Sequence, residues 1–257
     1  MANSASNRPD GGQLILLRHA QSEFNAANRF TGWADPPVTR LGEREAVRAG
    51  SAIAAAGCHP NVAFTSVLQR AVTTTRFVLD AADCAQVPVH RTWRLNGRHY
   101  GALQGKDKAL IQHEFGAEQV QRWRRSYDGR PPALSNDPNL RDPQYAALPL
   151  HMLPHTESLR DVTVRLLPYW RDAILPELAA GRTVLVVSHG NTLRALIKEI
   201  DSISDDEIVL LEVPTARPLL YRLDTGGRPL VAGGLYLDVD AHAESGNSDV
   251  QSYSSGN

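Results

Sequence analysis

Two histidines occupy equivalent places in this sequence, each close behind an apolar run. His19 follows the run within Gln13–Leu17 after one arginine, and His189 follows Thr183–Val187 after one serine. Short continuous apolar runs are typical of strands buried on both faces of a parallel sheet, and ligands bind at the carboxyl ends of such strands. We therefore expect both histidines in one pocket. A neutral imidazole can attack phosphorus, so one histidine is a candidate nucleophile and the other a candidate stabiliser.

Arginines accompany these histidines. Arg18 precedes His19, Arg70 follows a third apolar run, and Trp123-Arg124-Arg125 supplies two more guanidinium groups. The planar guanidinium fork pairs with phosphate or carboxylate, and it can neutralise the oxygens of a phosphoryl group during transfer. A single histidine after a strand is often a cap or a surface residue. The combination favours a site for a small anion.

Composition excludes several classes of protein. The chain has 257 residues, and 27 Lys plus Arg against 28 Asp plus Glu give a net charge of −1, so the total charge gives no support to a nucleic-acid or membrane partner. Cys58 and Cys84 lack the spacing of metal ligands and are expected to be buried free thiols. The first residues lack signal-peptide features, and no apolar run approaches the ~20 residues that span a bilayer. The sequence predicts a cytoplasmic protein.

Metal and nucleotide motifs are weak or absent. His151 and His155 have the spacing of two ligands on one helix face, but Pro149 and Pro154 disfavour a helix there. No G-x-x-x-x-G-K-[ST] and no helix-opening G-x-G-x-x-G occurs in the chain. We expect neither a metal site nor a nucleotide site of these kinds.

Apolar runs and helical patterns alternate along the chain. Strands are expected at Gln13–Leu17, Asn61–Thr65, Val87–Trp93 and Thr183–Val187, and helices at Leu41–Ala56, Val67–Ala82, Lys106–Tyr127 with a break near Gly116, and Ser158–Ala180. This alternation predicts an α/β fold, a three-layer single domain with a mostly parallel central sheet covered by helices on both faces.

Three segments lack this alternation of apolar runs and helical patterns. Gly129–Pro154 holds six prolines in 26 residues and is expected to be a long irregular loop, of the kind that is usually functional or mobile. Residues 1–12 are expected to be a flexible leader, and residues 241–257, rich in Ser, Asn, Gly and Asp, a disordered tail. The domain would then span residues 13–240.

Several longer motifs are specific enough to indicate a family. They are Leu17–Ser22, Asn28–Trp33, Thr65–Ala71, Arg98–Gly105, Trp123–Arg125 and Ser188–Asn191. Together they resemble the bisphosphoglycerate-dependent phosphoglycerate mutases of the histidine phosphatase superfamily, in the same order from about Leu14 to Asp238. The stretch R-H-Y-G-A-L-Q-G separates these mutases from the phosphatases of the superfamily.

The resemblance implies a mechanism and a set of site residues. His19 would carry a phosphoryl group, with Arg18, Arg70 and His189 around it, while 3- and 2-phosphoglycerate interconvert without a metal after priming by 2,3-bisphosphoglycerate. The residues that would bind the substrate are Ser22, Asn25, Thr31, Gly32, Arg98, Tyr100, Lys108, Arg124, Arg125, Gly190 and Asn191. The partners would be small phosphoglycerates, and the chain would form a homo-oligomer, a dimer or a tetramer.

One departure from the family pattern concerns catalysis directly. The family has L-N-E before R-H-Y-G, and this Glu moves the proton of the substrate hydroxyl, whereas Gly97 stands there in this chain. General acid–base catalysis typically contributes ~10²–10⁴-fold. A severely slowed mutase is expected unless water or another carboxylate, such as Asp107, fills the space. A phosphatase and a catalytically silent phosphoglycerate-binding protein are the alternatives.

Milder departures cluster around the same site. Ala20 replaces the Gly of R-H-G, Gln21 replaces a Glu, and Ala216 replaces the Gly of the family's P-T-G turn. An alanine at that turn costs energy if its φ is positive.

Overall fold

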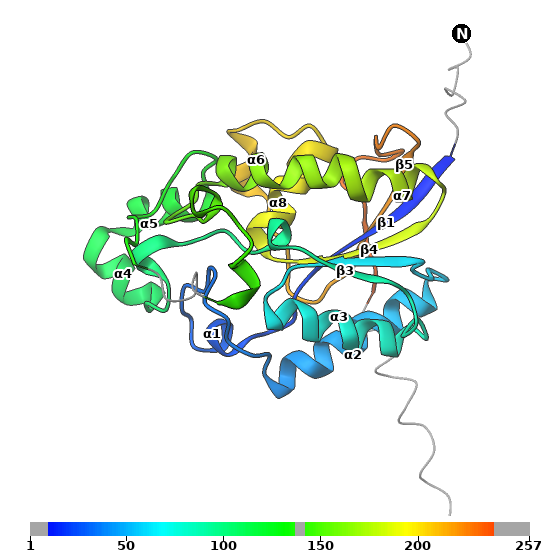
Figure 1. Cartoon of the computed structure of the whole chain (residues 1–257), viewed down its shortest axis with the longest axis horizontal. Coiled ribbons are helices and arrows are strands. Elements are labelled where there is room, and N and C mark those ends of the chain that lie inside the picture. The colour runs from blue at the N-terminus through cyan, green and yellow to red at the C-terminus, as the bar shows by residue number, and fades with distance from the viewer. Residues whose placement is uncertain (1–9, 137–141, 239–257) are drawn as a thin grey trace, which may run out of the picture.

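A six-stranded sheet forms the centre of the computed structural model, which describes residues 10–136 and 142–238 (Figure 1). The strands lie in the order β3 (Val89–Arg91), β2 (Val62–Thr65), β4 (Thr183–Ser188), β1 (Asp10–Arg18), β5 (Leu219–Asp224) and β6 (Leu235–Tyr236). The first four strands are parallel, β5 is antiparallel to β1, and β6 is antiparallel to β5. The predicted mostly parallel sheet is confirmed.

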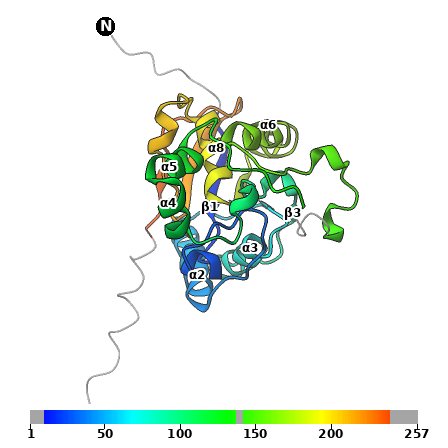
Figure 2. The same cartoon turned by 90° about the vertical axis from the view of Figure 1, so that its left-hand side faces the viewer.

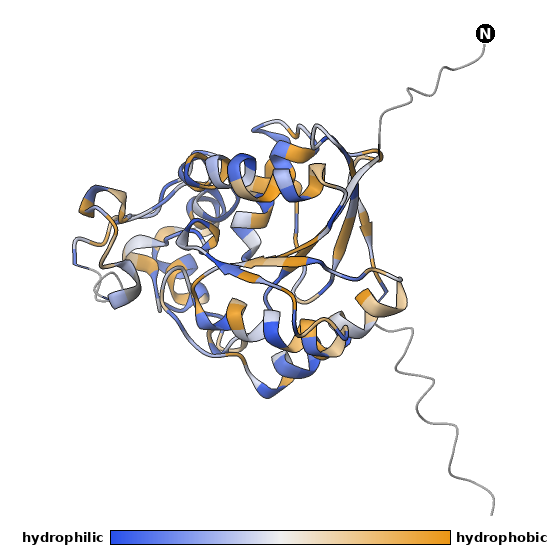
Figure 3. Cartoon of the chain, turned by 45° about the vertical axis from the view of Figure 1, so that its right-hand side comes forward, coloured by the Kyte–Doolittle hydropathy of each residue, from blue (hydrophilic) through white to orange (hydrophobic). Residues whose placement is uncertain are grey.

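Helices cover both faces of this sheet. One face is covered by α2 (Arg40–Ala55) and α3 (Gln69–Ala81), and the other by α6 (Leu159–Tyr169), a π-helical turn (Trp170–Ile174), α7 (Leu175–Ala179) and α8 (Gly190–Ile200). Alternate residues of β1 face opposite sides, since Ile15 and Leu17 pack in the α2–α3 core and Leu14 and Leu16 in the other. The central part of the sheet, where β1, β2 and β4 lie between the two helix layers, is accordingly mostly apolar (Figure 3). This arrangement is the predicted three-layer fold.

Shorter elements surround the end of the sheet where β1 and β4 finish. Helix α1 (Glu23–Ala26) follows β1, and α4 (Lys108–Phe115) and α5 (Ala117–Arg125) lie together beyond it. The predicted break at Gly116 is confirmed, and its φ of 83° is one that glycine adopts without strain. The 3₁₀ turns are Trp93–Leu95, Gly101–Leu103, Pro143–Tyr145, Leu150–Met152 and Glu207–Leu210.

Side-chain caps explain why the longer helices begin where they do. The Thr39 hydroxyl accepts a hydrogen bond from the Gly42 amide at 3.0 Å and starts α2, and Ser158 forms a capping box with Asp161 at the start of α6. The expected strand Val87–Trp93 is reduced to β3, because the Thr92 hydroxyl accepts from the Arg94 amide and starts a 3₁₀ turn. The β3 side chains are exposed, since this strand lies at the sheet edge.

Several elements differ from the sequence predictions. Strands β5 and β6 and helix α8 were not predicted, and β1 begins at Asp10, so residues 10–12 belong to the sheet rather than to a leader. The rest of the predicted leader and the predicted tail 241–257 lie outside the described residues. Cys58 and Cys84 are buried free thiols, as predicted.

The proline-rich segment has an irregular course in its described parts, 129–136 and 142–154, and contains two 3₁₀ turns. Its part 142–154 lies on the side of β3, away from α4 and α5 (Figure 2), whereas Gly129 lies next to the end of α5, where its amide donates to Ser126 Oγ at 2.9 Å. Tyr145 anchors it: this buried ring stacks on Trp33 at 5.0 Å between centroids, and its hydroxyl accepts from Asn96 Nδ2 at 2.9 Å. Within 10–136 and 142–238, no helix has the length and apolar character to cross a membrane.

Candidate active site

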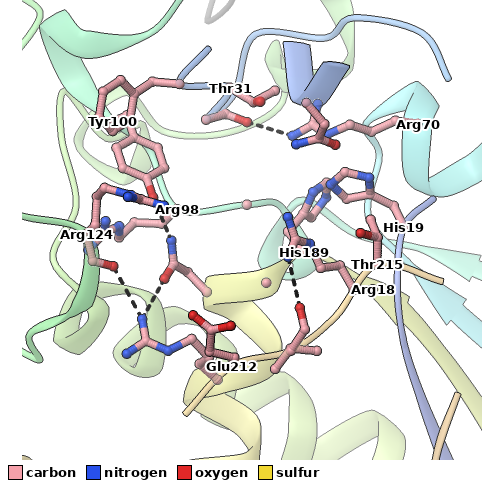
Figure 4. Close-up of a pocket in the computed structure, with 18 of the residues that line it drawn as sticks. Arg18, His19, Thr31, Arg70, Arg98, Tyr100, Arg124, His189, Glu212 and Thr215 are labelled. Carbon is pink, nitrogen blue, oxygen red and sulfur yellow. Dashed lines mark hydrogen bonds between the residues drawn. The ribbon is translucent and has the colours of Figure 1, made fainter. Parts of the chain in front are cut away.

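A cavity of about 560 Å³ opens at the carboxyl ends of β1 and β4 (Figure 4). Its wall includes the four predicted catalytic residues, Arg18, His19, Arg70 and His189, and also Gly97. Ten of the eleven predicted substrate-binding residues also lie on it: Asn25, Thr31, Gly32, Arg98, Tyr100, Lys108, Arg124, Arg125, Gly190 and Asn191. Segments far apart in the sequence thus converge on one space.

Ser22 is the one predicted site residue that the cavity wall does not include. Its hydroxyl caps α1 instead, donating to Asn25 Oδ1 at 3.0 Å and accepting from the Asn25 amide. That Ser22 contacts the substrate stays a prediction. Its place is structural, because it holds Asn25 on the wall.

His19 presents one nitrogen to the cavity. Its Nδ1 lies 2.8 Å from the Ala20 carbonyl oxygen, which only accepts, so Nδ1 carries the hydrogen and Nε2 keeps a lone pair. Burial lowers the pKa of His19 well below its ordinary value, and the charges of Arg70 and Arg18 lower it further. The ring is therefore neutral near pH 7, the form in which a histidine is a nucleophile.

His189 lies opposite, with its ring centroid 4.9 Å from that of His19 (Figure 4). It directly follows β4 and occupies the N-cap position of α8, so the positive end of that helix dipole faces the same space. Its Nε2 lies 2.8 Å from the Ser66 hydroxyl oxygen, whereas its buried Nδ1 has no partner. Burial, followed by the charge of Arg70, lowers its pKa well below the ordinary value.

Buried arginines line the cavity in fixed orientations. Arg70 donates to the Ala34 and Gly32 carbonyls at 2.9 and 2.8 Å, and Arg18 donates to the Val213 carbonyl at 2.9 Å. Burial lowers the pKa of Arg70 to about 10, although the nearby Asp35 carboxylate opposes this shift. The guanidinium groups are thus held by carbonyl oxygens before any ligand arrives.

Of these cations, Arg98 has the most guanidinium nitrogens without a hydrogen-bond partner. Its side chain is 1% exposed and stacks on the Tyr100 ring at 4.6 Å, yet none of its three guanidinium nitrogens has a hydrogen-bond partner. A buried cation without a counter-ion is costly to a folded protein. Its position is understandable if an anion completes its surroundings.

The same imbalance holds for the whole cavity. In the described part of the chain, eight buried side-chain nitrogen and oxygen atoms lack hydrogen-bond partners, and seven of them belong to residues of the cavity wall. These seven are all nitrogens, from Arg18, Arg70, Arg98, His189 and Arg194. Native proteins satisfy most buried polar groups, so this concentration of unpaired donors fits a ligand rich in phosphate or carboxylate oxygens.

Gly97 leaves a gap at the position where the family has its glutamate. A Cβ at Gly97 would lie 3.2 Å from His189 Cγ, and its φ lies outside the left-handed region. Its carbonyl accepts from Trp33 Nε1 at 2.7 Å and from the buried Arg165 at 3.1 Å, so the backbone here is fixed. A longer side chain at this position therefore requires the His189 ring to shift by a few tenths of an ångström.

Asp107 does not fill this gap. Its carboxylate caps α4, accepting from the Ala109 and Leu110 amides at 2.8 and 3.1 Å, and Asp107 is absent from the cavity wall. The prediction that it could replace the missing carboxylate is wrong. Among the described wall residues Glu212 is the single carboxylate, and it pairs with Arg125 and is mostly exposed.

Several residues of the wall were not predicted from the sequence: Arg29, Phe30, Arg194, Glu212, Val213, Pro214 and Thr215. Arg194 lies one helical turn after Asn191 and donates to its Oδ1 at 2.9 Å, so helical spacing could have indicated it. The segment 212–215 leads into β5, and because β5 is antiparallel to β1, its start lies at the same edge of the sheet as the end of β1.

Ala216, next to this segment, has the strained backbone that the sequence suggested. Its φ is 51°, and its amide donates to the Arg18 carbonyl at 3.0 Å. A left-handed alanine costs about 1 kcal/mol relative to glycine. The replacement of the family glycine is therefore unfavourable here.

Within the described ranges, no group of three or more His, Cys, Asp and Glu side chains could hold a metal ion.

Comparisons with known proteins agree with this geometry. Residues 14–232 match the model of the histidine phosphatase superfamily (branch 1), the class that the fold and the two histidines define. A 2,3-bisphosphoglycerate-dependent phosphoglycerate mutase of Streptomyces avermitilis is 54% identical over 90% of this chain and 92% of its own. The mutase of the same description from Streptomyces griseus is 55% identical over 89% and 92%.

The chain therefore belongs to the 2,3-bisphosphoglycerate-dependent phosphoglycerate mutases of this superfamily, and the family resemblance of the sequence is confirmed. Among solved structures, a mycobacterial glucosyl-3-phosphoglycerate phosphatase with VO3 covers 82% of this chain and 90% of its own, with a TM-score of 0.63. Because the two sequences are 24% identical, this likeness supports the fold alone.

Proposed function

We propose that this chain interconverts 3-phosphoglycerate and 2-phosphoglycerate through a phosphohistidine at His19, without a metal ion. The observation that carries the proposal is the set of seven unpaired buried nitrogens around the cavity. They match a small ligand with two anionic groups better than a neutral ligand. The family membership of the chain supports the same reaction.

His19 has the arrangement that the nucleophilic step requires. When bound, 2,3-bisphosphoglycerate supplies the phosphoryl group that His19 carries. The lone pair on Nε2 attacks phosphorus, a P–N bond forms, the P–O ester bond breaks, and the leaving oxygen takes a proton. Arg18, Arg70 and His189 donate hydrogen bonds to the phosphoryl oxygens as the charge on them changes.

The remaining wall residues hold the glycerate part of the substrate. Arg98 supplies the deepest unpaired charge and suits a carboxylate or the second phosphate. Asn191 Nδ2 donates to the Tyr100 hydroxyl at 3.0 Å, which orients both side chains toward the same ligand. The further binding residues in this proposal are Asn25, Thr31, Gly32, Lys108, Arg124, Arg125 and Gly190.

The proton of the substrate hydroxyl takes a different route from that of the family. Gly97 has no carboxylate, and Asp107 is occupied at the start of α4. We propose that water in the space beside Gly97 carries this proton, which makes turnover slower than in relatives that have the glutamate. The same opening gives water a path to the phosphohistidine, so slow phosphatase activity is the second candidate function.

Incubation with 2,3-bisphosphoglycerate followed by intact mass measurement tests the proposal. We expect one added phosphoryl group. When 3-phosphoglycerate is then added, we expect 2-phosphoglycerate to form while the phosphoryl group stays on the enzyme, because His19 gives its phosphoryl group to the substrate hydroxyl and takes the other one back. Excess EDTA should change neither result, because arginines neutralise the charge that a metal neutralises elsewhere. Release of inorganic phosphate alone would identify a phosphatase. No addition would identify a silent binding protein, and a requirement for a divalent ion would contradict metal-free transfer.

Tyr100 predicts how substrate affinity depends on pH. Burial raises its pKa, but the charges of Arg98 and Arg124 outweigh burial and lower the pKa to about 8. Above that pH a phenolate stands beside the anionic substrate, so KM should rise with pH by up to roughly tenfold per unit. Tyr100→Phe should abolish this rise in steady-state measurements from pH 6.5 to 9. An equal rise in the variant would show that another group causes it.

The resemblance also suggests an assembly and a location. We propose a homo-oligomer, a dimer or a tetramer, in the cytoplasm, acting on free phosphoglycerates rather than on a nucleic acid or a membrane. Sedimentation velocity of the full chain tests the assembly.

A further inference from the structure

The hydrogen bond between Ser66 and His189 has no assigned role in the proposed reaction. Ser66 directly follows β2, is fully buried, and is not part of the cavity wall. Its hydroxyl oxygen lies 2.8 Å from His189 Nε2 and also accepts from the Leu68 amide at 3.3 Å. The serine therefore contacts the Nε2 side of the histidine ring, and the other ring nitrogen, Nδ1, has no partner.

Hydrogen-bond accounting with an anion in the cavity gives the direction of this contact. The Ser66 oxygen already accepts from a backbone amide, and in the described part of the chain its hydroxyl hydrogen has a single acceptor, His189 Nε2. In the empty site either tautomer leaves one hydrogen without an acceptor, on the Ser66 hydroxyl or on His189 Nδ1. When an anion lies against Nδ1, only the tautomer in which the serine donates to Nε2 leaves no hydrogen unpaired. The hydroxyl therefore donates to Nε2, which keeps its lone pair.

The placement of the remaining hydrogen on His189 follows from its charge. Arg70, His19, Arg165 and Arg18 surround the ring, and burial with these charges keeps it neutral near pH 7. A neutral imidazole has one N–H, and with a lone pair on Nε2 that hydrogen is on Nδ1. His189 Nδ1 is the buried nitrogen without a partner, on a residue of the cavity wall.

We propose that Ser66 is a positioning residue that holds His189 in the Nδ1–H tautomer, so that the single hydrogen of the ring points at the phosphoryl oxygens. The proposal rests on the proposed function, because it assigns a donor to the group transferred there. The other tautomer would present a lone pair to an anion, and that contact is repulsive. His19 is held in the complementary way, since its Nδ1–H is bound to the Ala20 carbonyl and Nε2 presents the lone pair.

Nitrogen NMR of protein labelled with ¹⁵N-histidine tests the tautomer directly. His189 is assigned by the resonances that disappear in His189→Asn, and we expect Nδ1 protonated and Nε2 unprotonated in the wild-type chain. In Ser66→Ala we expect a mixture of tautomers. We also expect single-turnover phosphorylation of His19 by 2,3-bisphosphoglycerate to slow roughly 10- to 100-fold, the usual size of a hydrogen bond to a charged group.

Matched variants separate positioning from packing. Thr65→Val removes the neighbouring buried hydroxyl, which has no hydrogen-bond partner, and should change neither the tautomer nor the phosphorylation rate. Ser66→Thr keeps the hydroxyl and should preserve the Nδ1–H tautomer. Protonated Nε2 in the wild-type chain would overturn the proposal, as would an unchanged tautomer in Ser66→Ala.

Failure of this proposal is distinguishable from failure of the proposed function. The tautomer is read without turnover, so a chain that 2,3-bisphosphoglycerate does not phosphorylate still gives the NMR result. If circular dichroism shows that Ser66→Ala does not fold, the His189 tautomer in the wild-type chain and in Ser66→Thr tests the proposal.

Discussion

His19→Ala is expected to abolish phosphoryl transfer from 2,3-bisphosphoglycerate, with a loss of activity on the order of 10⁴-fold or more. His19 Nε2 is a neutral nucleophile held toward the phosphoryl site, and the described cavity wall offers no cysteine or serine that could replace it. Binding of 3-phosphoglycerate should largely survive, because the arginines stay in place. Intact mass, a coupled mutase assay and calorimetric titration measure the three quantities.

The control for this variant is an exposed histidine away from the cavity. His113 lies in α4 with its side chain in solvent, so His113→Ala should leave phosphorylation and turnover unchanged. Undiminished turnover in purified, folded His19→Ala would contradict the phosphohistidine mechanism. Loss of binding together with turnover would mean instead that His19 contributes to the ground-state complex.

Gly97→Glu is expected to raise mutase turnover by about 10²–10⁴-fold, the usual contribution of a general acid–base group. The backbone at Gly97 has a φ that any residue adopts, and the Trp33 and Arg165 side chains hold its carbonyl. The new Cβ would lie 3.2 Å from His189 Cγ, so the ring must move by a few tenths of an ångström. Steady-state turnover of 3-phosphoglycerate measures the gain.

Two further substitutions at Gly97 isolate the carboxylate. Gly97→Ala makes the same contact with His189 without an acid, and Gly97→Gln adds an amide of the same size as the glutamate. Neither should raise turnover, and their unfolding midpoints report the strain that the Cβ introduces. A folded Gly97→Glu protein without any gain would contradict this account and shift the explanation to Ala20, Ala216 or a different substrate.

The central layers of the fold could be predicted because their strands are buried on both faces. Each of β1, β2 and β4 contains a continuous apolar run and leads toward a helix pattern. The two antiparallel strands could not be predicted in this way. β5 contains the exposed Arg222 among buried residues, and β6 has two residues, so neither forms a continuous apolar run, and their pairing depends on tertiary contacts.

Site residues could be predicted where a chemically reactive side chain directly follows a strand of the central sheet. His19 and His189 follow strands whose ends meet, so their proximity follows from topology alone. Asp107 was misjudged because a carboxylate at the start of a helix is used by the amides of its first turn. Nothing in the local sequence indicated that Glu212 lies at the site, since its position depends on the direction of β5, which the local sequence does not fix.

The unpaired nitrogens of the cavity tie the folding of this chain to its ligand. Buried donors without acceptors destabilise the empty native state, and an anion that satisfies them binds the folded chain but not the unfolded one. At a ligand concentration 100 times Kd, this linkage adds about 2.7 kcal/mol to the free energy of unfolding. We therefore expect phosphoglycerate, the metabolite on which we propose this chain acts, to keep more of it folded and less of it open to proteolysis.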